Sequence, residues 1–324
     1  MSIIDKESDE FSVKGSRETV DYSGKVTLPK WADMEKIRLA QKLHNRYRFS
    51  LSIAHLDGLL CLVFIETIHR TLSNTGKSDS YVALFRRYFD TLMHVKKWYE
   101  NDFWIENNPG YQSLQEVKEM HRRVSDSQNK NLKDGDVRSI SLKDMALTQF
   151  AFIGFIILCP EQLGFSTKKK DLEAVAHFWA VCGSMLGIPD EYNLCLGEYD
   201  RINRRCRKIL DEDFRPRMEE FSNKSSEMSE KIYFVYNRVI ALFSYKATMK
   251  YLFDTLQLQC PFQMNLFDSS VLAVMKIIMK LFYRFTIVRL CFNYLSIIMV
   301  QVAKMKFVQN RIIRNLRLLD LKSQ

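Results

Sequence analysis

Hydrophobic residues recur at helical spacing along most of the chain, in stretches separated by short polar loops. This spacing predicts helices over residues 31–48, 81–99 and 171–186. Two other stretches, 51–72 and 142–159, are more uniformly apolar. The first is interrupted by polar residues, and the second is shorter than the roughly 20 residues that a bilayer span requires. We therefore expect neither stretch to span a bilayer, and we expect 142–159 to be a buried core helix.

Glycine and proline are scarce, which favours a helical fold over a sheet fold. The 324 residues include 11 glycines and 6 prolines, whereas a β-sandwich or barrel needs turn-forming residues about every ten positions. With 47% hydrophobic residues the chain can bury one large core. The seven cysteines include no Cys-x-x-Cys pair, so we expect reduced thiols. The predicted fold class is all-α, with a main domain at residues 31–261.

The first 30 residues are predicted to form a disordered polar tail. They mix Ser, Lys, Asp, Glu and Gly without helical or strand periodicity. The opening MSIIDKESDEF is acidic and lacks the basic and then apolar order of a signal peptide. It also lacks the arginine-rich composition of a transit peptide. We therefore expect an intracellular protein that does not enter the secretory pathway by that route.

The C-terminal segment, residues 262–324, carries most of the net positive charge. Of the formal charge of +10, residues 271–324 contribute ten Lys and Arg side chains and one acidic side chain. Lys276, Lys280 and Arg284 recur at four-residue intervals and so share one helical face. Two arrangements remain open: an interfacial helix with this basic stripe toward lipid phosphates, or a bilayer span formed by the apolar residues that follow. Both predict helices that associate with a membrane surface.

One histidine lies on the apolar side of a predicted helix. Ser113, followed three residues later by a glutamate, predicts a capping box that begins this helix. The apolar stripe consists of Val117, Met120, His121 and Val124. A buried imidazole needs a partner for each ring nitrogen, and a metal is one such partner. The residues alone leave two interpretations of His121 open: a core histidine and a ligand of haem iron.

Arg87 and Thr91 lie four residues apart on the preceding helix and point a cation and a hydroxyl in the same direction. Together with His121 they resemble, in order and interval, an Arg-x-x-x-Thr pattern followed by a Met-His or Leu-His helix. That pattern occurs in the family of latex clearing protein and the ER-bound oxygenases of fungal mycophenolate synthesis. The stretches DMALTQFAFIGFIIL and HFWAVCGSMLGIPDEYNLC also resemble this family, so the similarity covers residues 31–200.

The resemblance implies a haem b protein with a globin-like helical core. His121 would be the iron ligand, and Arg87 and Thr91 would be catalytic residues on the dioxygen side of the haem. Lys118 takes the place of a basic family residue and would neutralise a haem propionate. His177 begins the HFW stretch and would line the pocket, bond a propionate or make a structural hydrogen bond.

Two residues depart from the pattern of the rubber-cleaving members of this family. Asp90 stands where they have a lysine, and Ser125 stands where they have a second arginine. Rubber cleavage itself is therefore not carried over to this chain. Asp90 could act as a catalytic general base toward an allylic carbon, or it could be a solvated acid beside Arg86 and Lys97.

These observations predict a membrane-associated, haem-dependent oxygenase that uses dioxygen on a lipophilic substrate, for example an isoprenoid. The resemblance implies the endoplasmic reticulum membrane as its location. A non-catalytic haem- or lipid-binding protein of the same fold and a cofactor-free membrane scaffold are the alternatives. The chain has no glycine-rich phosphate loop and no nucleic-acid-binding signature, so we expect no nucleic-acid partner.

Overall fold

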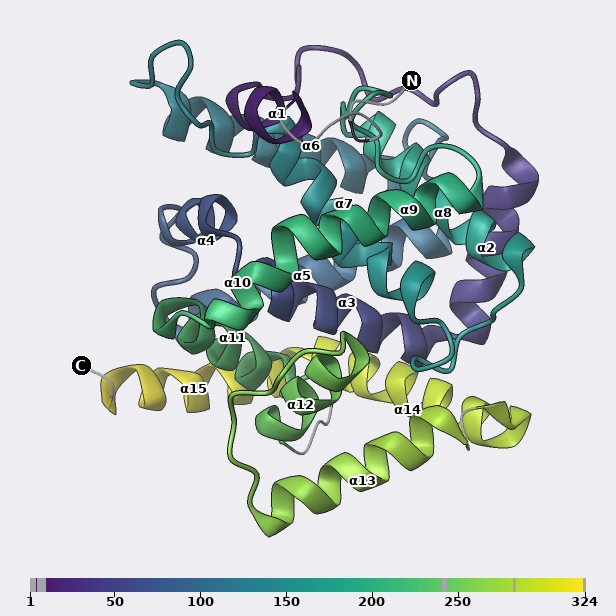
Figure 1. Cartoon of the computed structure of the whole chain (residues 1–324), viewed down its shortest axis with the longest axis vertical. Coiled ribbons are helices and arrows are strands. Elements are labelled where there is room, and N and C mark those ends of the chain that lie inside the picture. Colours follow the sequence, from purple (N-terminus) through teal and green to yellow (C-terminus); the bar gives the residue numbers. More distant parts are fainter. Residues whose placement is uncertain (1–3, 5–9, 241–243, 282–283, 323–324) are drawn as a thin grey trace.

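Helices account for the regular structure of the chain (Figure 1). The computed structural model describes residue 4 and residues 10–240, 244–281 and 284–322. The α-helices are α1 (Gly15–Arg17), α2 (Met34–Arg46), α3 (Arg48–Leu62), α4 (Glu66–Ser73), α5 (Tyr81–Glu100), α6 (Pro109–Asn129), α7 (Leu142–Leu158), α8 (Lys169–Met185), α9 (Tyr199–Ile209), α10 (Arg215–Glu220), α11 (Asn223–Tyr236), α12 (Tyr245–Thr255), α13 (Leu266–Lys280), α14 (Thr286–Lys304) and α15 (Lys306–Lys322). The predicted all-α fold class is confirmed.

Helix α7 lies at the centre of the core and packs against α3. The two backbones approach closely because α3 has no side chain at Gly58. A Cβ atom there would lie 1.8 Å from the carbonyl oxygen of Ala151 on α7. The apolar stretch 142–159 is therefore a buried core helix, as predicted. The stretch 51–72 is divided, because the chain bends by 93° between α3 and α4.

Helix α6 begins five residues earlier than the sequence predicted, with Asn108 rather than Ser113 as its N-cap. Asn108 accepts a hydrogen bond from the backbone N–H of Gly110, and Pro109 occupies the first turn, where its missing N–H costs nothing. Ser113 is consequently not a helix cap. It is a buried residue inside α6 whose hydroxyl contacts α5.

The part of the predicted polar tail that the structure describes packs on the body of the protein. Val20 and Val26 are buried, and the Tyr111 hydroxyl donates a hydrogen bond to the carbonyl of Val26. The backbone N–H of Leu142 donates to the carbonyl of Glu18. The sequence showed no periodicity here because the segment after α1 is extended. Its buried apolar side chains are single ones, and Val20 lies beside Gly187, which follows α8.

Helix α14 turns a polar side to the core. Its buried residues are Arg289, Asn293, Ser296, Val300 and Ala303. The Asn293 amide accepts a hydrogen bond from the N–H of Phe49 (3.1 Å) and donates one to the carbonyl of Arg46 (2.8 Å). These backbone groups lie where α2 ends and α3 begins, so the side chain satisfies groups that a helix terminus leaves without helical partners.

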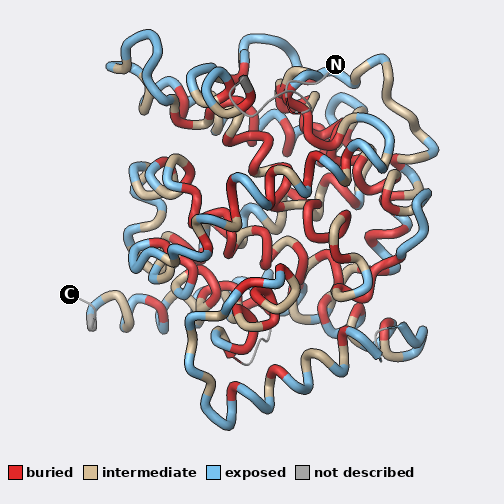
Figure 2. Tube along the Cα trace, viewed as in Figure 1, coloured by how far each residue is buried: buried red, intermediate tan, exposed pale blue. Residues whose placement is uncertain are grey.

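Many residues of the C-terminal helices are exposed (Figure 2). Among the described residues, 16 of the 21 exposed large hydrophobic side chains lie between Leu266 and Leu321. Among all the residues that the structure describes, α14 is the single helix long and apolar enough to cross a membrane. Only 22% of its apolar window is buried. The bent pair of α3 and α4 meets this criterion only when the two are taken together.

Candidate functional site

Helices α5 and α6 pack side by side and carry most of the predicted site residues. Ser113 joins them at one end. Its hydroxyl accepts a hydrogen bond from the indole N–H of Trp98 (3.0 Å) and lies 2.7 Å from Nδ1 of His94. Because the indole can only donate, the serine proton is free to go to His94. Ser113 thereby fixes the orientation of two α5 side chains against α6.

His121 is partly buried on α6, and its Nδ1 atom is buried without a hydrogen-bond partner. Burial lowers the pKa of His121 to about 4, and the nearby His94 adds to this shift. The imidazole is therefore neutral at pH 7 and has an unprotonated ring nitrogen. An unpaired buried polar group typically costs about 1–3 kcal/mol, so this nitrogen is a candidate for a partner that the polypeptide does not supply.

Tyr22, from the extended N-terminal segment, covers His121. The two rings meet edge to face with centroids 6.5 Å apart, and the Tyr22 hydroxyl is likewise buried without a hydrogen-bond partner. The apolar stripe that predicted an inward-facing histidine is only partly correct. Val117 is buried, whereas Met120 is 39% exposed.

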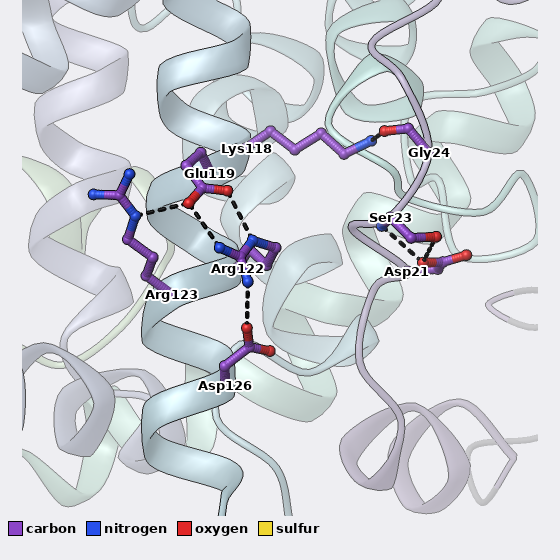
Figure 3. Close-up of polar contacts among 8 residues, drawn as sticks. All are labelled: Asp21, Ser23, Gly24, Lys118, Glu119, Arg122, Arg123 and Asp126. Carbon is purple, nitrogen blue, oxygen red and sulfur yellow. Dashed lines mark hydrogen bonds and ion pairs between the residues drawn. The ribbon is translucent and has the colours of Figure 1, made fainter.

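Lys118 is buried and points to the N-terminal segment (Figure 3). Its ammonium donates a hydrogen bond to the carbonyl of Gly24 at 2.7 Å. Desolvation lowers the pKa of Lys118, while Asp21 opposes that shift. The described arrangement therefore uses this cation to hold the N-terminal segment. One bond to Gly24 leaves further donor protons on the ammonium, and a contact with a haem propionate stays a prediction.

Arg87 and Thr91 on α5 bond to their own surroundings. The Arg87 guanidinium donates to the carbonyl of Leu72 (3.1 Å) and to the hydroxyls of Ser78 (2.5 Å) and Thr75 (2.8 Å). Thr91 is exposed, and its hydroxyl donates to the carbonyl of Arg87 at 3.0 Å. In this arrangement Arg87 anchors the loop between α4 and α5. The predicted distal role of both residues is not visible in their contacts.

Asp90 lies on the exposed side of α5, one turn before His94. Desolvation raises the pKa of its carboxyl, although His94 and three neighbouring cations oppose the shift. His94 interacts electrostatically with both Asp90 and His121. His94 therefore lies close enough to Asp90 and to the partly buried His121 to interact electrostatically with both.

His177 and Ser125 are engaged elsewhere. The Nε2 atom of His177, on α8, accepts a hydrogen bond from the backbone N–H of Asp33 at 2.7 Å, and its ring lies edge-on to Trp31. This contact ties α8 to the start of α2, which is the structural bond that the sequence left open. Ser125 is buried on α6, and its hydroxyl accepts from Asn129.

The sequence interpretation missed His94 and Tyr22. His94 follows Arg87 by seven residues and Thr91 by three, so helical spacing alone places it on their face of α5. No local signal identifies Tyr22, because its contact with His121 joins segments about one hundred residues apart. Among the described residues no group of three or more His, Cys, Asp or Glu side chains is arranged to hold a metal ion. The described residues therefore include no site for a metal ion held by three or more such side chains.

No protein-family model and no curated protein sequence matches the chain. A solved structure does. The chain is similar in fold to latex clearing protein in its closed state, with a TM-score of 0.53 and 13% sequence identity. The similarity covers 85% of this chain and 76% of that protein. At this identity the likeness establishes a distant structural relationship and a shared helical fold.

Proposed function

We propose that this protein is a haem-dependent oxygenase that acts with dioxygen on a lipophilic substrate at a membrane. The observation that carries the proposal is His121, a neutral histidine with an unpaired buried nitrogen. It lies in a fold similar to that of latex clearing protein. The resemblance in residue pattern and the likeness in fold both point to latex clearing protein, and the likeness in fold covers 85% of this chain.

The residues around His121 fit an iron ligand in their chemistry. A neutral imidazole coordinates metals through its free nitrogen, and burial keeps His121 neutral well below pH 7. When bound, haem would supply dioxygen activation, which no side chain provides. Tyr22 shields the ring from water on one side, and the Ser113 bonds to Trp98 and His94 hold α5 in place beside α6.

Attachment to a membrane surface is supported by the outward apolar side of α14 and its neighbours. The side of α14 that faces away from the core includes Ile287 (77% exposed), Tyr294 (64%) and Ile298 (56%). Exposed apolar side chains concentrated in one segment are typical of an interaction surface, and the basic residues of this segment favour anionic lipids. An intracellular membrane such as the endoplasmic reticulum is the proposed location.

The basic residues predicted to face lipid phosphates are Lys276 and Lys280 on α13 and Arg284 beyond its end. Lys276 forms an ion pair with Asp254 (2.6 Å), and Arg284 lies 3.6 Å from Glu161. Lys280 is exposed. Two of the three cations therefore approach acidic residues of the helical body, so the apolar surface becomes the main support for attachment.

The experiment that tests the proposal is the absorption spectrum of the purified full-length chain. We expect a Soret band and stoichiometric haem, both lost in His121→Ala. The matched control is His69→Ala, which removes another partly exposed histidine on α4. A wild-type protein reconstituted with haem that shows no Soret band, or equal haem content in the two variants, would refute the proposal.

A second candidate is a protein that binds haem or lipid without turnover. It is favoured by Arg87, whose guanidinium bonds the end of α4 and two hydroxyls of the loop between α4 and α5. Incubating the haem-loaded protein with dioxygen and a panel of polyisoprenoids separates the two candidates. Aldehyde or ketone products support the oxygenase, and their absence across the panel supports binding without turnover.

A further inference from the structure

A cavity of about 280 Å³ lies between α14 and the helical body, on the opposite side of α5 from Arg87. Its α5 residues include Leu92 and Lys96, which are roughly 140° and 180° around the helix from Arg87 at about 100° per residue. Neither His121 nor its neighbours Tyr22 and His94 line it. This cavity is therefore separate from the site of the proposed function.

Two histidines, the buried His44 and the partly buried His55, line the cavity and pack against aromatic rings. His44 on α2 stacks on Tyr99 with centroids 4.3 Å apart, and Tyr99 in turn stacks on Phe178. His55 on α3 lies edge-on to Trp179 at 5.8 Å. Burial lowers the pKa of His55 to about 4 and that of His44 well below its ordinary value. Both rings are therefore neutral at pH 7.

Three nitrogen atoms of the cavity residues are buried without hydrogen-bond partners. They are Nδ1 of His44, Nε2 of His55 and Nε of Arg48. His44 itself is only 7% exposed. Unpaired buried polar atoms are rare in folded proteins, and here three of them belong to one cavity. This grouping of unpaired nitrogen atoms indicates a ligand that places hydrogen-bonding atoms near His44, His55 and Arg48.

The charge balance of the cavity favours an anion. Its charged lining residues are Arg48, Lys96 and Glu100. Arg48 and Lys96 both pair with the single carboxylate of Glu100, at 2.9 Å in the case of Arg48. The net formal charge of these three groups is therefore positive. Because the Arg48 Nε is unpaired, the pairing with Glu100 does not exhaust its donors.

The remaining wall of the cavity is mostly aliphatic, with Ser52, Ser296 and Gln301 among its lining residues, and α14 completes it. Leu92 and Val95 from α5 face Ile297 and Val300 from α14 across the cavity. Helix α14 thus lines the cavity and also carries exposed apolar side chains such as Ile287 and Ile298, which belong to the surface proposed to contact lipid. An apolar wall together with a cationic, hydrogen-bonding end is complementary to an amphiphile.

We infer that this cavity binds the carboxylate end of a fatty-acid-like amphiphile, with the carboxylate at Arg48 and Lys96 and the chain against Val95, Ile297 and Val300. At about 280 Å³ the cavity is near the lower end of the roughly 300–1,000 Å³ typical of ligand pockets, so it accommodates the head and the first carbons of the chain. The inference does not depend on haem at His121.

Binding of labelled dodecanoate to the full-length chain in nanodiscs of neutral phospholipid tests the inference, with empty nanodiscs as background. We expect saturable binding that Lys96→Gln weakens about tenfold, as loss of a charge-assisted contact predicts. The control Lys97→Gln removes the neighbouring charge, which does not line the cavity, and should bind as wild type does. Dodecanol and acetate should each bind at least tenfold more weakly than dodecanoate.

Three results would overturn the inference: no saturable dodecanoate binding, equal affinity in Lys96→Gln and Lys97→Gln, or equal affinity for dodecanol and dodecanoate. Ser52→Phe is a second variant, placed to fill the cavity from α3, and it should abolish binding while thermal unfolding confirms that the variant folds. His121→Ala should bind dodecanoate normally, so failure of the haem proposal and failure of this one are distinguishable.

Discussion

Asn293 allows the orientation of α14 to be tested directly. The side chain is 4% exposed and bonds the N–H of Phe49 at 3.1 Å and the carbonyl of Arg46 at 2.8 Å. Asn293→Ala removes both contacts from the junction of α2 and α3. Each hydrogen bond contributes about 1 kcal/mol net, and backbone groups that lose a partner in a buried site add a desolvation cost. We expect the variant to lose about 2–3 kcal/mol of unfolding free energy.

Guanidinium unfolding of the full-length chain, followed by circular dichroism in one detergent, measures this loss. The control Asn310→Ala removes an exposed amide from α15 and should change the unfolding free energy by no more than about 0.5 kcal/mol. If Asn293→Ala is as stable as Asn310→Ala, then α14 does not dock through its polar side. The outward placement of its apolar residues would then lose its basis.

Three further predictions follow from contacts described above. Gly58→Ala should destabilise the fold by about 3 kcal/mol, because the added Cβ atom would lie 1.8 Å from the carbonyl oxygen of Ala151. A melting temperature equal to that of the wild type would contradict the close approach of α3 and α7. The pKa of His121 is lowered from 6.5 to about 4, so the folded protein resists protonation that the unfolded chain accepts. The stability that this provides above pH 6.5 should be lost as pH falls toward 4, and His121→Gln should show a shallower loss of denaturation midpoint between pH 7 and 4.5. Replacing Ile287, 77% exposed on α14, by Asn should reduce flotation with anionic liposomes, whereas Ile105→Asn, at a 49% exposed site outside the C-terminal segment, should not; equal flotation of the two variants would argue against α14 as the contact surface.

The positions of the helices followed from the sequence, because periodicity is a local property of the chain. The stretch predicted over 81–99 is α5, Tyr81–Glu100, and the stretch over 171–186 is α8, Lys169–Met185. The predicted start of α6 was wrong because the sequence contains two possible N-caps, Asn108 and Ser113. Asn108 with Pro109 begins the helix, and Ser113 serves a contact with α5 that its spacing from Glu116 does not reveal.

The candidate site was only partly predictable. The sequence placed Arg87, Thr91 and His121 on two helices, and the structure packs those helices together. The partners of these side chains depended on distant segments. Arg87 bonds the loop before α5, and Lys118 bonds the N-terminal segment at Gly24. Long side chains reach several possible partners, and only the packed chain selects among them.

The sequence by itself determined the helical class, the buried central helices and the amphipathic, basic character of the C-terminal segment. Each of these follows from residue type and from spacing within one helix. Only the tertiary structure decided that α14 turns Asn293 inward, since the backbone groups that this amide satisfies lie at a helix junction more than two hundred residues earlier. The same holds for the cavity that His44 and His55 both line. Helices α2 and α3, which carry these histidines, must pack against α5 and α14 before the unpaired nitrogen atoms of both rings belong to one cavity lining.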